Sequence, residues 1–178
     1  MKKTNEEAGA ASPGELRDLP GYPSEERLEI GPVAVIECPQ EIPCNPCESA
    51  CRFNAIVVGK PIINLPHLIE EKCRGCGECI AACPGLAIFL VNRTYSAAEA
   101  TVSMPYEYLP LPEVDSSVDA LNRLGERVCS GRVIRVANPK KNNNTAVVTV
   151  AVPKQYSDQV RNFRMKNKNA DMQMRGSN

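Results

Sequence analysis

Eight of the nine cysteines lie between residues 38 and 83, in two groups of four. The first group has the spacing C-x5-C-x2-C-x3-C from Cys38 to Cys51, and the second has C-x2-C-x2-C-x3-C-P from Cys73 to Pro84. Two residues between cysteines form a tight loop that presents neighbouring thiolates to a common centre. The segment must therefore fold around whatever its sulfurs hold.

Composition limits the chemistry of these thiols. No apolar segment follows Lys2 and Lys3, and the longest apolar run, Leu86 to Val91, is too short to cross a bilayer. We therefore expect a cytoplasmic protein with no membrane association, whose cysteines serve as metal ligands rather than disulfides. The 21 basic and 21 acidic residues leave no net charge that would attract nucleic acid.

The cysteine-rich segment is internally repeated. A shift of 32 residues places "CNPCESACRFNAIVV" at 44–58 over "CGECIAACPGLAIFL" at 76–90, and three cysteines coincide. Ala50, Ala55 and Ile56 of the first copy also match their counterparts in the second. The repeat indicates a duplicated unit with approximate two-fold symmetry.

The second cysteine run is the one used by bacterial ferredoxins for [4Fe-4S] clusters, and the region resembles a bacterial-type dicluster ferredoxin. This resemblance implies two [4Fe-4S] clusters, with the fourth cysteine of each run reaching the cluster of the other half. Carried over residue by residue, it implies that cluster one is held by Cys38, Cys44, Cys47 and Cys83, and cluster two by Cys73, Cys76, Cys79 and Cys51.

Two departures from the family pattern fall in the first half. Cys38 is followed by five residues instead of two, which leaves its ligation open, although a slightly longer loop changes the closure entropy little. Arg52 stands where the second run has proline, and it either lies near the cluster or is simply exposed. Structural zinc is the alternative metal. A structural zinc site uses two separate C-x2-C pairs, and the further cysteine of each C-x2-C-x3-C run would have no role in it.

The pattern as a whole predicts an α+β fold. Short apolar runs open and close the cysteine-rich part, and both indicate strands, at Val33–Cys38 and Leu86–Val91. Three prolines between 105 and 112 exclude a continuous helix there. The expected parts are a disordered or partner-bound arm at 1–27, a ferredoxin-like pseudo-two-fold domain at 28–92, a proline-rich strap at 93–114, a β-rich module at 115–170 and a tail at 171–178.

The β-rich module is expected to be an SH3-like barrel or a hairpin. Two β-branched runs within 132–153 predict a hairpin, and the apolar spacing of Val160 and Phe163 behind Ser157 predicts a short helix. Residues 116–124 fit either a capped helix or a strand followed by a turn at Gly125; we favour the strand.

Other candidate residues have simpler interpretations. Cys129 is expected to be a buried hydrophobe, and His67 a surface or capping residue. The excess of bases after Lys154 is either a solvated face or a contact for an acidic partner.

The sequence has no G-x-G-x-x-G motif, no P-loop and no nucleophile with a nearby histidine base, so we expect no catalytic residues of its own. One-electron transfer is the function that the cysteine pattern still supports. The layout also resembles the ferredoxin-like subunits of flavin-dependent amino-acid dehydrogenases of anaerobes, of the proline, hydroxyproline or sarcosine type, which implies a hetero-oligomer with a larger flavin-containing subunit. A free-standing dicluster ferredoxin and a metal-stapled interaction module are the alternatives.

Overall fold

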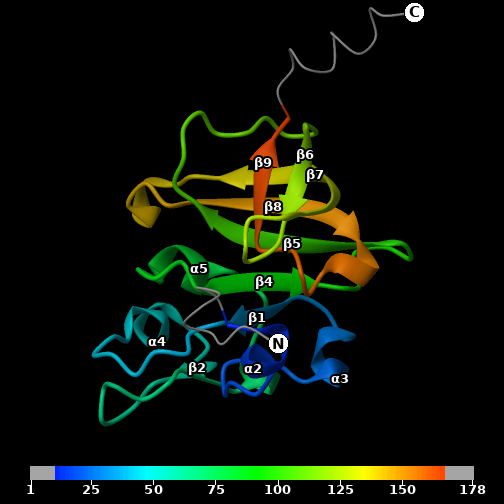
Figure 1. The fold of residues 1–178 in the computed structure, drawn as a ribbon. Helices are drawn as coiled ribbons and strands as arrows, with labels where there is room; N and C mark the ends of the chain where they lie inside the picture. The colour runs from blue at the N-terminus through cyan, green and yellow to red at the C-terminus, as the bar shows by residue number, and fades with distance from the viewer. Residues whose placement is uncertain (1–10, 167–178) are drawn as a thin grey trace, which may run out of the picture.

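A computed structural model gives the fold and describes residues 11–166. Short helices and loops gather at one end of the molecule, and the later strands form the other end (Figure 1). The helices are α2 (Pro13–Arg17), α3 (Glu25–Leu28), α4 (Pro46–Ala50) and α5 (Glu78–Ala82), with short 3-10 turns at Glu70–Lys72, Lys140–Asn142 and Lys154–Tyr156. The strands are β1 (Val33–Ile36), β2 (Ile56–Val57), β3 (His67–Leu68), β4 (Ile88–Asn92), β5 (Glu99–Tyr106), β6 (Ser117–Leu121), β7 (Arg127–Ala137), β8 (Ala146–Pro153) and β9 (Asn162–Met165).

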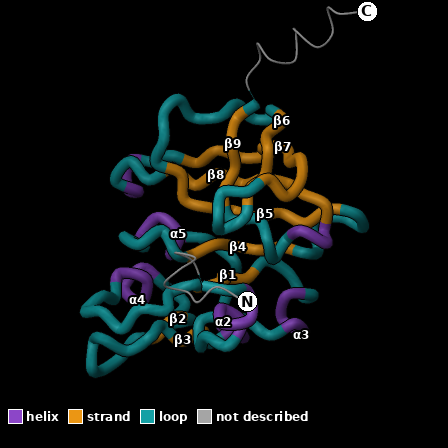
Figure 2. Tube along the Cα trace, viewed as in Figure 1, coloured by secondary structure: helices purple, strands orange, loops and turns teal. Residues whose placement is uncertain are grey.

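One seven-stranded antiparallel sheet runs through the molecule in the order β1-β4-β5-β8-β7-β6-β9, and β2 pairs with β3 separately. The strands expected at either end of the cysteine-rich part are confirmed as β1 and β4, which pair with each other. Most of the chain between them is loop (Figure 2). Because β4 also pairs with β5, the cysteine-rich part and the β-rich part share one sheet.

The structure differs from the sequence prediction at 93–114, where a strap was expected. Residues Glu99–Tyr106 form β5, a strand in the middle of the sheet. The prolines exclude a helix but not a strand, and Pro105 lies beyond Ser103, where the pairing with β4 ends. Pro110 and Pro112 follow the strand and lie outside it.

The C-terminal predictions had mixed outcomes. The hairpin is confirmed as β7 and β8, and 116–124 contains strand β6, with a turn at Gly125 that has a φ of +77°. The helix predicted after Pro153 is wrong. A 3-10 turn and strand β9 occupy this region, because β6 offers a free edge with which β9 pairs. Tertiary pairing outweighs the weak helical spacing of Val160 and Phe163.

The segment 11–27 carries helices where an arm was expected. Ser12 caps α2 in a reciprocal bond with Glu15, and Leu16 is buried. Ser24 caps α3, and its backbone N–H and hydroxyl also donate to the carboxylate of Glu70 at 2.7 and 2.8 Å. These helices are too short to show a periodic pattern in the sequence. Residues 1–10 of the expected arm, and 167–178 of the module and tail, lie outside the described residues.

Two hydrophobic cores are present. One packs around the cysteines and includes Leu28, Ile36, Ile56 and Ile80. The other lies inside the curled sheet, where Phe163 of β9 stacks on Tyr106 of β5 with the ring centroids 4.8 Å apart. Within residues 11–166, no helix is long and apolar enough to cross a membrane.

Candidate iron-sulfur site

The eight clustered cysteines divide between two cavities next to the packed helices α4 and α5. Each cavity is lined by four thiols that come from both halves of the repeat. The first cavity is lined by Cys38, Cys44, Cys47 and Cys83. The second cavity is lined by Cys51, Cys73, Cys76 and Cys79. These groups coincide with the two ligand sets inferred from the sequence; ligation itself stays a prediction.

The two helices produce this exchange between the halves. Cys47 and Cys79 lie within α4 and α5 and are buried, each facing the cavity of its own half. Cys51 and Cys83 follow at the helix C-caps, where the backbone becomes extended, with ψ of 93° and 110°. One helical turn therefore separates two thiols that line different cavities.

Glycine is required in the loop that carries Cys76. Gly75 and Gly77 have φ of +65° and +77°, a region that residues with a Cβ rarely adopt. A Cβ on Gly75 would lie 2.7 Å from the ring and from the carbonyl oxygen of Pro32. The loop can therefore pack this closely against Pro32 only with glycine at position 75.

Backbone amides point at several of the sulfurs. The N–H groups of Ala55 and Ala87 donate to Cys51 Sγ at 3.2 Å and Cys83 Sγ at 3.5 Å, at matching positions of the repeat. The N–H of Ala34 donates to Cys73 Sγ at 3.5 Å. Such bonds stabilise negative charge on a ligating sulfur and tune a bound cluster.

The buried thiols favour a positively charged centre. Burial, with the nearby thiols of Cys83 and Cys44, raises the pKa of Cys47 to about 11. Burial and the neighbouring cysteines raise the pKa of Cys79 as well. Thiolates, the form that binds metal, are therefore unfavourable here unless a cation offsets their charge.

The donor set fits an iron-sulfur cluster. Each cavity has four cysteine sulfurs. Among the described residues no histidine or aspartate lines either cavity, and the one lining carboxylate, Glu78 at the second, is paired with Arg52 and Lys141. Within residues 11–166, no three cysteine, histidine, aspartate or glutamate side chains converge closely enough to hold a single ion. Four thiols spread around a cavity suit a multi-atom cluster better than a zinc ion, which requires ligands at about 2.3 Å.

The two departures in the first half have clear positions. Cys38 lines the first cavity despite its longer loop, whose Ile42 lines the same cavity, and the N–H of Cys44 donates to the carbonyl of Ile62 at 3.4 Å. Arg52 is largely exposed and forms an ion pair with Glu78, its Nε donating at 2.9 Å. Arg52 thus bridges the two halves of the repeat at the surface.

Lys141 Nζ also donates to the carboxylate of Glu78, at 2.8 Å. The hydrogen bonds from Arg52 and Lys141 lower the pKa of Glu78 to about 2. Lys141 belongs to the β7–β8 hairpin, so its approach to Glu78 was not visible in the sequence.

A buried ionic cluster beside Cys38 was also missed by sequence reasoning. Glu37 is buried and accepts hydrogen bonds from Nε of Arg123 and Nε of Arg161, both at 2.7 Å. Arg161 also lies over the ring of Phe89, with its guanidinium carbon 5.1 Å from the centroid. Glu37 follows β1 directly, so the two arginines fix the start of the Cys38 loop.

Arg27 anchors the start of the second cysteine run, at Cys73. Its guanidinium donates to the carbonyl oxygens of Pro32 and Cys73, each at 3.0 Å. The remaining candidate residues lie elsewhere: Cys129 is buried in the core of the curled sheet, and His67 is exposed on β3.

Comparison with known proteins identifies the chemistry of the second half. Residues 66–89 match the family model described as "4Fe-4S binding domain". The chain therefore contains a 4Fe-4S ferredoxin-type domain and binds at least one [4Fe-4S] cluster. No solved structure matches the chain significantly.

Two curated relatives match parts of the chain. One component of the Na(+)-translocating ferredoxin:NAD(+) oxidoreductase complex of Acetobacterium woodii is 44% identical over 45 residues, which cover 25% of this chain and 13% of the relative. The polyferredoxin-like subunit of aliphatic sulfonate oxidoreductase of Pyrococcus furiosus is 40% identical over 58 residues, 30% of this chain and 28% of the relative. The chain thus spans less than a third of the length of either relative.

Proposed function

We propose that this protein is an electron-transfer subunit that relays single electrons through two [4Fe-4S] clusters. In the proposal, cluster one is ligated in the first cavity and cluster two in the second. The observation that carries it is the division of eight thiols into two four-thiol cavities, each built from both halves of the repeat. A [4Fe-4S] cluster supplies reversible one-electron transfer at a potential set by its surroundings.

The protein's own residues prepare these surroundings. Ile36 and Ile88 line the first cavity and are nearly fully buried, and Ala34, Ala55 and Ile56 do the same for the second. They exclude water from one side of each cavity, while the backbone amides described above donate to the sulfurs. A dry side and amide donors together allow the chain to tune the potential of each centre.

We further propose that the protein works within an oxidoreductase complex. Both curated relatives are subunits of such complexes. Large apolar side chains are also exposed: Leu109 retains 86% and Tyr108 66% of its accessible surface. A flavin-containing dehydrogenase subunit is the partner that we propose, as the resemblance of the layout implies. A free-standing ferredoxin would have no need of this apolar surface.

Anaerobic purification with metal analysis tests the proposal. Roughly eight iron and eight acid-labile sulfide per chain are expected. Zinc, or an absence of sulfide, would overturn the assignment and favour a metal-stapled module. Tagged protein recovered from its native cell should retain a flavoprotein at high salt; recovery of a monomer that binds partners only at low salt would favour a free-standing ferredoxin.

A further inference from the structure

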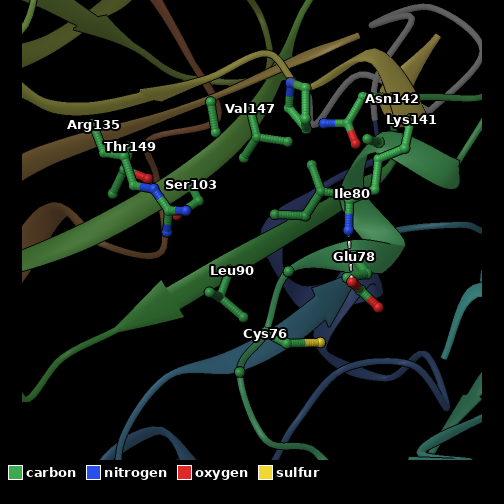
Figure 3. A pocket seen from close by; sticks show the side chains of 15 residues that line it. Cys76, Glu78, Ile80, Leu90, Ser103, Arg135, Lys141, Asn142, Val147 and Thr149 are labelled. Carbon is green, nitrogen blue, oxygen red and sulfur yellow. Dashed lines mark hydrogen bonds and ion pairs between the residues drawn. The ribbon is translucent and has the colours of Figure 1, made fainter. Parts of the chain in front are cut away.

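A groove lies beside Cys76, between α5 and the outer face of the sheet (Figure 3). The strand register places Leu90, Ser103, Thr149 and Arg135 in one row across β4, β5, β8 and β7. Helix α5 packs against this face, and the groove follows its edge as far as the β7–β8 hairpin. Cys76 is the exposed member of the eight clustered cysteines.

The charges around Cys76 are mainly positive. Arg135 and Lys141 line the groove, Arg74 lines the adjoining second cavity, and Arg52 pairs with Glu78 next to Cys76. We call these four side chains the basic rim. Lys141 pairs with the same Glu78, and among the described residues Glu78 is the one acidic side chain that lines the groove or the second cavity. Within residues 11–166, Arg74 and Arg135 are exposed, and their side chains form no hydrogen bond or ion pair.

The first cavity has no such rim. Its lining consists of cysteines, prolines, isoleucines, Gln40 and Asn64, with no charged side chain. Glu37, next to it, is buried and paired with two arginines, and the exposed charge of the loop after Cys38 is acidic, Glu41. Since the whole chain has no net charge, the positive field is local to the exposed thiol of the second cavity.

From this arrangement we propose that the groove beside Cys76 is the docking site of an acidic redox protein, which exchanges one electron at a time with the second cavity. This inference rests on the proposed function and adds which end of the protein faces that partner. Exposed arginines whose side chains have no partner among the described residues are available to pair with carboxylates of another protein, and they steer its approach. Of the four thiols that line the second cavity, Cys76 is the exposed one, so it brings that cavity to the surface at the groove.

The apolar part of the groove fits this role. Leu90 and Val147 are partly exposed and line the groove, and they supply the apolar contact that the core of an interface requires. The hydroxyls of Ser103 and Thr149 bond to each other at 2.8 Å, and one of them retains a proton to donate into the groove. A segment bearing carboxylates beside apolar side chains matches this lining.

Binding can be measured without electron transfer. Fluorescein-labelled polyglutamate is titrated into the oxidised holoprotein and followed by anisotropy at low ionic strength. Arg135→Glu and the double variant R74E/R135E are expected to weaken binding on the order of tenfold or more. Arg164→Glu is the matched control, because Arg164 is another exposed arginine without a described partner, on edge strand β9.

Electron transfer with two small oxidants locates the site beside the second cavity. Reduced protein is mixed with the anion Co(EDTA)⁻ or the cation Co(NH₃)₆³⁺, and each cobalt(III) takes one electron to become cobalt(II). R135E is expected to lower the rate of electron transfer to the anionic oxidant and to raise the rate to the cationic one. R164E should change neither rate. Unlabelled polyglutamate should slow Co(EDTA)⁻ in the wild type.

Equal effects of R135E and R164E in both assays would overturn the proposal. So would polyglutamate binding that leaves the Co(EDTA)⁻ rate unchanged, since the acidic chain would then dock elsewhere. Failure of the proposed function would be recognised separately, because a preparation without iron and sulfide could not be reduced at all.

Discussion

The two cysteine cavities are built from the same repeat but have different surroundings. The first is bordered by a long loop with prolines, Ile42 and the exposed Glu41, and the arginines nearest to it are paired with the buried Glu37. The second is bordered by a glycine loop, opens at Cys76 and is surrounded by the basic rim. The repeat thus gives both cavities four thiols, whereas loops and distant strands give each cavity its own environment.

Removing a buried thiol should have the largest effect. Cys79→Ala is expected to lose about four iron per chain, because the second cavity would keep three thiols. Cys129→Ala, which removes a buried thiol outside both cavities, should retain the full iron content. Iron and sulfide assays on anaerobically purified variants check this, and equal loss in both variants would contradict the division of the cysteines.

Breaking the ionic cluster should disturb the first cavity. Glu37→Gln leaves the buried Arg161 and the partly buried Arg123 without their carboxylate, which costs about 3–5 kcal/mol of unfolding free energy. The loss should be accompanied by faster release of iron from the half that contains Cys38.

Denaturant unfolding and iron release to a chelator measure the two effects. Glu41→Gln, in the exposed loop after Cys38, is the control and should change neither. If E37Q were as stable as E41Q, the account of how the Cys38 loop is held would be wrong.

A methyl group in the glycine loop should disturb the second cavity instead. Gly75→Ala forces a Cβ to within 2.7 Å of Pro32 at a φ of +65°, which we expect to cost about 2–3 kcal/mol. Gly85→Ala introduces the same methyl group with no atom within 4 Å and should be nearly neutral. Thermal unfolding compares them; a neutral G75A would show that the loop can move away from Pro32.

Acid should weaken the ion pairs of Asp158, a residue that lines neither cavity. Burial alone would raise the pKa of Asp158, but hydrogen bonds from Arg93 and the charges of Arg161 and Arg17 hold it below its usual value. A depressed pKa in the folded state gives stability that is present above the unfolded value, about 3.9, and is lost as the pH falls through the folded pKa.

Asp158→Asn should remove this part of the pH dependence. The expected effect is about 1 kcal/mol or less, because the pair is partly open to solvent. Unfolding of the wild type and D158N, measured between neutral pH and pH 3, checks it. Parallel stability curves for the two proteins would contradict this role of Asp158.

Local pattern explains what the sequence predicted correctly. β1, β4 and the β7–β8 hairpin are continuous apolar or β-branched runs, and the cysteine spacing itself encodes the tight loops. β5 was missed because Pro105 suggested a break, and β9 because its pairing with β6 decides its conformation. Glu37 with Arg161, and Glu78 with Lys141, are far apart in sequence, so only the folded sheet brings them together.

The central claim is that each cavity draws thiols from both halves, and chemical protection of the thiols tests it most directly. Cys83→Ala holoprotein is treated anaerobically with iodoacetamide, and the alkylated cysteines are mapped by mass spectrometry. The account predicts alkylation in the first half at Cys38, Cys44 and Cys47. It predicts protection at Cys51, Cys73, Cys76 and Cys79. Alkylation of Cys73, Cys76 and Cys79, with Cys38, Cys44 and Cys47 protected, would contradict it.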